Sequence, residues 1–165
     1  MKTLIIFFIA VIMVVTVDAQ TPQLKPTLKP LPGNKTLTVV LPADLTITNI
    51  TLSRAMFSAD LKQWLIKVFV TVKNNGGVIT PQTFIKPVIQ KTGSTEWKYI
   101  GSTDLFPAVK PGESITREYT FPDKQKIISP RDSFSFKLII DSDNTIKEGN
   151  ENNNESSAIL ISSSN

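Results

Sequence analysis

The sequence predicts an all-β protein that folds as a seven-stranded antiparallel β-sandwich. From about Asp44 onward, apolar residues recur at every second position, and many of them are β-branched. Clusters of Gly, Pro, Asn and Asp separate short runs of this kind, as expected for strands joined by turns. No window after the first twenty residues has a convincing helical pattern, which favours stacked sheets over a mixed fold.

The segment from Trp64 to Val72 is the clearest strand, because its even positions are all apolar and its odd positions include Lys67 and Thr71. Asn74 and the residues after it form the turn that ends it. Pro87 lies inside a later run and indicates an edge strand or a bulge there, because proline cannot donate to a ladder. The seven predicted strands are 45–52, 64–72, 83–90, 97–100, 114–121, 133–140 and 157–162.

The same alternation predicts the core of the sandwich. Residues that are two apart on a strand share a face, so the apolar positions of the second and sixth runs should point at one another across the two sheets. The predicted core residues are Ile66, Val68, Val70, Phe134, Phe136, Leu138 and Ile140.

Three regions divide the chain. Residues 1–19 carry a positive start, an apolar run from Leu4 to Val17 and small or apolar residues before Gln20, which is the pattern of a secretory signal peptide. Residues 20–42 form a Pro/Lys-rich linker, which we expect to be extended. The domain is expected at 43–163, in a secreted protein of the periplasm, cell surface or medium that has no membrane span once the signal peptide is removed.

The amino-acid composition excludes several kinds of catalytic and metal-binding site. The chain contains no Cys and no His, so disulfides, thiolate or His-based zinc sites, and Ser-His-Asp or Cys-His catalysis are excluded. The formal net charge is +4, but no stripe of basic residues interleaved with aromatics marks the predicted domain, and we expect no nucleic-acid binding. The sequence therefore predicts a protein that is not an enzyme and needs no cofactor.

An acidic, Asn-rich loop at 141–155 lies between the last two predicted strands. One interpretation is structural, because Asp and Asn side chains bind nearby backbone N–H groups and stabilise turns, with Ile146 reaching back into the core. A second is a weak calcium site, because Asp141, Asp143, Glu148 and Glu151 offer hard oxygen ligands within one loop. A glycosidase pair of Glu148 and Glu151 is disfavoured, because a polar loop supplies no walled cleft.

Trp97 and Tyr99 are two residues apart and so share a strand face. If they face solvent, they form a small ligand-binding platform; otherwise they cover the core or one of its edges.

Four stretches resemble the CARDB domain, a cell-adhesion-related domain found in bacteria. They are an opening Asp-Leu strand at 43–47, V-x-V-x-N-x-G at 70–76, a P-G-E-S turn at 109–114, and the closing D-x-D-N-x-I-x-E-x-N-E-N-N at 141–153. The fourth is specific in length and spacing, and all four occur in the order of the family. The resemblance covers 44–162 and implies an immunoglobulin-like seven-stranded sandwich that serves as a module of bacterial surface or secreted proteins.

Two functions follow as hypotheses. The first is a secreted or cell-surface binding or adhesion module that recognises an extracellular or envelope protein or glycan. The second is a ligand-free structural spacer of an envelope assembly, with or without a weak calcium site in the 141–155 loop. Fold alone does not decide between them.

Overall fold

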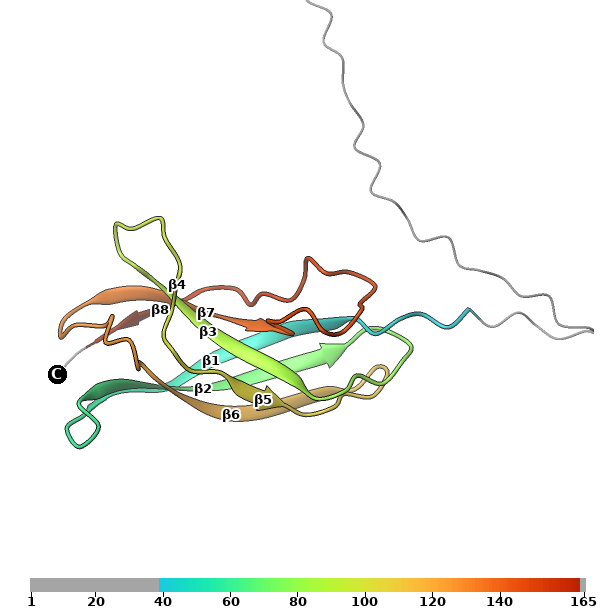
Figure 1. The fold of residues 1–165 in the computed structure, drawn as a ribbon, viewed down its shortest axis with the longest axis horizontal. Helices are drawn as coiled ribbons and strands as arrows, with labels where there is room; N and C mark the ends of the chain where they lie inside the picture. The colour runs from blue at the N-terminus through green and yellow to red at the C-terminus, as the bar shows by residue number, and fades with distance from the viewer. Residues whose placement is uncertain (1–38, 164–165) are drawn as a thin grey trace, which may run out of the picture. The chain divides into compact units, whose positions relative to one another are not determined.

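The computed structural model describes residues 39–163, which form two packed antiparallel sheets (Figure 1). The first sheet consists of β1 (Leu45–Ser58), β2 (Gln63–Asn74) and β6 (Ser114–Pro122), with β2 in the middle. The predicted signal peptide and residues 20–38 of the predicted linker lie outside the described residues. Between residues 39 and 163, no helix has the length and apolarity to cross a bilayer.

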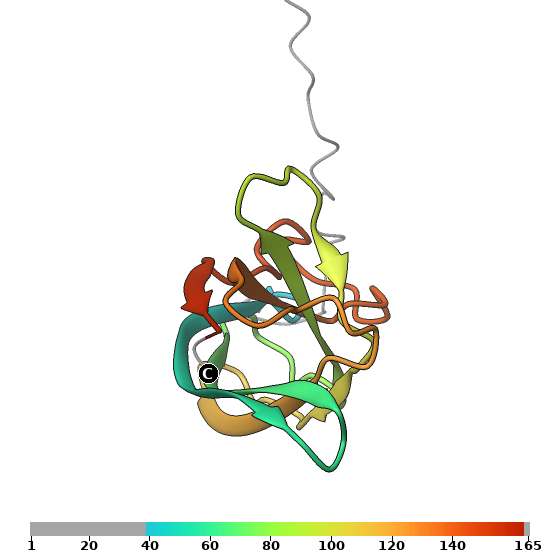
Figure 2. The ribbon, with the colours of Figure 1, turned by 90° about the vertical axis from the view of Figure 1, so that its left-hand side faces the viewer.

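The second sheet has the order β4-β3-β7-β8, and β5 pairs with the first part of β3. Its strands are β3 (Thr83–Lys91), β4 (Lys98–Tyr99), β5 (Asp104–Phe106), β7 (Ser133–Ile140) and β8 (Ile159–Ser162). Seen along the long axis, the two sheets enclose a common interior (Figure 2). The predicted all-β sandwich is confirmed, with eight strands rather than seven because the short β5 was not predicted.

Alternation along β2 and β7 builds the interior. The even positions of both strands are buried, and the odd positions are mostly half-exposed. All seven predicted core residues are at most 1% exposed, so the predicted core is confirmed. Ile146 is also buried in the core, as the structural interpretation of the 141–155 loop predicted.

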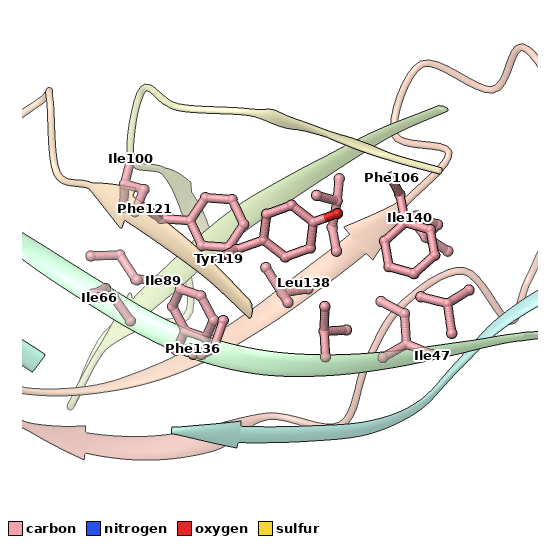
Figure 3. Packing of buried hydrophobic residues seen from close by; sticks show 14 of the residues in the cluster. Ile47, Ile66, Ile89, Ile100, Phe106, Tyr119, Phe121, Phe136, Leu138 and Ile140 are labelled. Carbon is pink, nitrogen blue, oxygen red and sulfur yellow. The ribbon is translucent and has the colours of Figure 1, made fainter. Parts of the chain in front are cut away.

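A line of aromatic rings connects the two sheets through the core (Figure 3). The centroids of Phe106 and Tyr119 are 6.2 Å apart, those of Tyr119 and Phe121 5.7 Å, and those of Phe121 and Phe136 6.3 Å. The Tyr119 hydroxyl donates a 2.9 Å hydrogen bond to the carbonyl of Leu105. This bond ties β6 of the first sheet to β5 of the second, and it satisfies the one polar atom of the ring.

Two details differ from the sequence predictions. β1 continues to Ser58, six residues beyond the predicted strand, and its register shifts between Ile47 and Asn49 and between Leu52 and Arg54. These shifts break the simple alternation that the prediction used.

β3 is not an edge strand, although Pro87 lies in it. Neither β4 nor β5 pairs with Pro87, so the residue without an N–H falls in the gap between those two short strands.

Residues 41–44 are held between two loops where the chain enters β1. Gly77 N–H donates to the carbonyls of Leu41 and Pro42, and Gly149 N–H donates to Ala43 at 2.8 Å. A Cβ on Gly76 would overlap the carbonyl oxygen of Pro42, so only glycine permits this close approach. The chain enters β1 at one end of the sandwich and leaves β8 at the other (Figure 1).

Candidate functional site

The solvent side of β3, β4 and β7, called here the outer face, carries the aromatic pair that the sequence singled out. Along β3, Phe84, Lys86 and Val88 alternate with residues that point into the core. The strand register places Val88 between Tyr99 of β4 and Lys137 of β7. Val88 is only 5% exposed although it is not part of the core cluster, so side chains cover it from the solvent side.

Trp97 and Tyr99 each lie under a lysine. Lys137 Nζ is 4.4 Å from the centroid of Trp97, and Lys86 Nζ is 5.1 Å from the centroid of Tyr99. Both distances fall within the range of cation–π attraction. Both rings are half-buried, and neither belongs to the core cluster. The pair therefore lies at β4, the end strand of the second sheet, half-buried and outside the core cluster.

The two lysines differ in their other partners. Lys137 forms an ion pair with Glu155, which follows β7 in the closing loop. Lys86 has no acidic partner within 4.0 Å among residues 39–163. Its charge therefore remains available at the surface, next to the ring of Tyr99.

An open hollow of about 290 Å³ lies at one end of the outer face. Tyr99, Phe84 and Lys86 form one part of it, and Phe84 is 42% exposed. The other lining residues are polar: Thr103, Ser142 and Asp143. The hollow therefore combines two aromatic rings with a cation, a carboxylate and two hydroxyls.

Asp141 fixes the turn that presents Ser142 and Asp143 to the hollow. It is 3% exposed, and its Oδ1 accepts hydrogen bonds from the Thr83 hydroxyl at 2.7 Å and from the Thr145 hydroxyl at 3.1 Å. Its Oδ2 accepts the N–H of Ile146 at 3.0 Å. Asn144 N–H closes the turn onto the Asp141 carbonyl at 2.8 Å. The carboxylate of Asp141 thus binds the backbone and side chains on both sides of the turn and holds it in place.

Glu148 is a second buried acid of the same loop, 7% exposed. Its Oε1 accepts the N–H of Leu45 at 3.2 Å, whereas its Oε2 is buried without a hydrogen-bond partner. Burial raises the pKa of Glu148 from 4.5 to about 7; the hydrogen bonds from Leu45 and Asn154 lower it, and the charges of Asp141 and Glu151 raise it. Near neutral pH this carboxyl is therefore shared between its protonated and charged forms.

The four acids considered for calcium have different surroundings. Glu151 accepts the N–H of Glu148 at 2.8 Å, Asp141 is bonded within its turn, and Asp143 lies in the hollow of the outer face beside Tyr99. In residues 39–163 no group of three or more acidic side chains is arranged to hold a metal ion. The structure thus brings Asp143 and Tyr99 together, an association between two separately considered sites that the sequence did not predict.

Sequence reasoning missed Lys86, Phe84, Thr103 and Ser142 as members of this face. A signal for Lys86 was present, because it is the one charged residue in the first seven positions of β3, and Lys137 is the one charged residue of β7. Alternate residues of a strand face opposite sides of the sheet, so a charged residue in an otherwise apolar strand marks the side that faces solvent. Which aromatic each lysine covers depends on strand register, which the sequence did not give.

Comparison with solved structures gives several matches. One is the CARDB domain of a Pyrococcus furiosus protein in complex with di-metal ions, 22% identical, with a TM-score of 0.49 over 73% of this chain and 88% of that one. Another is a domain of a protein described as a cell surface protein from Methanosarcina acetivorans, 16% identical, with a TM-score of 0.48 over 74% and 92%. A third is a β-glucosidase from Erythrobacter marinus, 14% identical, with a TM-score of 0.44 over 73% of this chain but 15% of that one. The search of curated proteins gave no match.

The sequence profile of the CARDB family matches residues 42–158, which is more than half of the chain. This match contains the four stretches that resembled the family, from the opening strand to the acidic closing loop. CARDB is a family of cell-surface-associated domains. The chain belongs to the CARDB family.

Proposed function

We propose that this protein is a secreted or cell-surface binding module without catalytic activity, which recognises an envelope or extracellular protein or glycan through its outer face. The observation that carries the proposal is the pair of half-exposed aromatic rings, each beside a lysine, on the solvent side of β3, β4 and β7. Rings that keep a free edge or face offer contact area at little cost in conformational entropy.

The sequence supports export. Residues 1–19 have the layout of a signal peptide, and a CARDB domain is consistent with a place at the cell surface. Expression of the full chain in an exporting bacterial host should release a protein whose mass corresponds to a start at Gln20. Retention of residues 1–19 in the exported protein would contradict this part of the proposal.

Binding is tested with the double variant Trp97→Ala/Tyr99→Ala on a glycan array and in pull-downs from envelope extracts. The wild-type protein should retain a ligand that the double variant loses. The matched control is Phe69→Ala, which removes an aromatic ring that is 43% exposed on the first sheet. Equal retention by wild type and double variant, with both folded by circular dichroism, would refute the role of the outer face.

A structural spacer is the second candidate, and one observation favours it. Residues 41–44 are held on both sides by backbone hydrogen bonds to Gly77 and Gly149, so the first strand starts from a fixed support. A spacer needs such an attachment but no ligand. If no glycan or envelope component binds the wild-type protein, the spacer becomes the better account.

A further inference from the structure

We infer that the hollow lined by Phe84, Lys86, Tyr99 and Asp143 binds one ring of a neutral sugar. The inference rests on the proposed binding function of the outer face and specifies the class of ligand. The hollow lies within that face, but it is built from three segments far apart in sequence: β3, the stretch from β4 to β5, and the turn after β7.

The size of the hollow suits a single small ring. Its volume of about 290 Å³ is just below the range of small-molecule sites, about 300–1,000 Å³, and leaves room for one small ring only. It is open rather than enclosed, so the ring it holds can belong to a longer chain that continues along the outer face. The next aromatic ring on that face is Trp97, which is half-buried and lies under Lys137.

The lining combines the groups that a sugar needs. The Tyr99 and Phe84 rings offer apolar surfaces for the C–H faces of a pyranose. Lys86 donates hydrogen bonds, Asp143 accepts them, and the hydroxyls of Thr103 and Ser142 can do either. Adjacent hydroxyls of a sugar act as donors and acceptors at once, which matches this set.

Charge argues for a neutral ligand. The hollow contains one cation, Lys86, and one carboxylate, Asp143, so its formal charges cancel. An acidic sugar would be attracted by Lys86 but repelled by Asp143. A purely apolar ligand would leave both charged groups without partners, which is costly.

The hollow is also held in shape before any ligand arrives. Asp141 anchors the turn that carries Ser142 and Asp143 through bonds to Thr83 and Ile146. Ser142 N–H also reaches the carbonyl of Phe84 at 3.4 Å, which links the turn to β3. Preorganisation of this kind lowers the cost of binding.

The test is saturation-transfer NMR of the exported protein with a panel of neutral oligosaccharides made of glucose, mannose, galactose or N-acetylglucosamine. Tyr99→Ala should weaken binding of the responding sugar by about two- to twelvefold, because the loss of a stacked ring costs roughly 0.5–1.5 kcal/mol. Tyr99→Phe keeps the ring and should retain most of the affinity. Asp143→Asn and Lys86→Met should each weaken binding, whereas Phe69→Ala should not.

The outcomes separate this inference from the proposed function. A sugar response that depends on Tyr99 and Asp143 supports both. If the double variant at Trp97 and Tyr99 loses an envelope protein but no sugar of the panel binds, the sugar inference is overturned and the binding function stands. If neither a sugar nor an envelope component binds the wild-type protein, both are overturned.

Discussion

Replacement of Glu148 by glutamine should make the protein more stable at alkaline pH and leave it almost unchanged at acid pH. Glu148 is buried with Oε2 unpartnered, and its pKa is raised from 4.5 to about 7. A raised pKa means that the folded protein favours the protonated form. The stabilisation from the protonated Glu148 carboxyl is complete below the pKa that this group has in the unfolded protein. It is lost as the pH rises through the pKa that the group has in the folded protein.

The magnitude follows from the two pKa values. One pKa unit corresponds to about 1.4 kcal/mol, so the rise from 4.5 to about 7 amounts to roughly 3 kcal/mol between acid and alkaline solution. Glutamine cannot ionise and can still accept the N–H of Leu45. The variant should therefore gain up to about 3 kcal/mol over wild type at about pH 8, and almost nothing at about pH 4.

Urea unfolding followed by tryptophan fluorescence measures this difference, because Trp64 is 3% exposed in the folded state. Asp60→Asn is the control, since it removes a carboxylate from the exposed turn between β1 and β2. The difference between variant and wild type should grow from about pH 5 to about pH 8 for Glu148→Gln only. A constant difference across that range, or one that grows toward acid, would refute the burial argument.

Three further predictions concern the core, the anchored segment and the acidic loop. Val70→Asp should abolish cooperative unfolding, because it buries an unpaired charge, whereas Phe69→Asp on the exposed side should melt normally; a normal melt of both would contradict the core. Gly76→Ala should lower stability by about 2 kcal/mol or more in urea, because its methyl group overlaps Pro42, whereas Gly149→Ala should cost less, since its Cβ is 3.4 Å from the nearest atom. Millimolar calcium should leave the melting midpoint unchanged, because Asp141 is already bonded; a rise that Glu151→Gln removes would establish a calcium site.

The sequence predicted those parts of the fold in which local alternation is regular. β2 and β7 have one apolar residue at every second position, and the core that they build was predicted residue by residue. β5 is three residues long and its run ends at Pro107, too short a run to show a period. The second half of β1 was missed because two register shifts disturb its alternation.

The candidate site was predictable only in part, because its members meet through strand register. Tyr99 was identified from the sequence, but Lys86 and Asp143 join it only when β3 pairs with β4 on one side and β7 on the other. Glu148 was considered as a metal ligand from its chemistry alone. Its hydrogen bond from Leu45, 103 positions away, could not be deduced from the local pattern.

The placement of the two ends has a mechanical consequence. Because β1 begins at one end of the sandwich and β8 ends at the other, tension between these two points would run along the strands (Figure 1). Antiparallel hydrogen bonds are perpendicular to the strands, so such a pull would load all the bonds between β1 and β2 together instead of unzipping them one at a time. The sandwich should therefore resist stretching between the start of β1 and the end of β8.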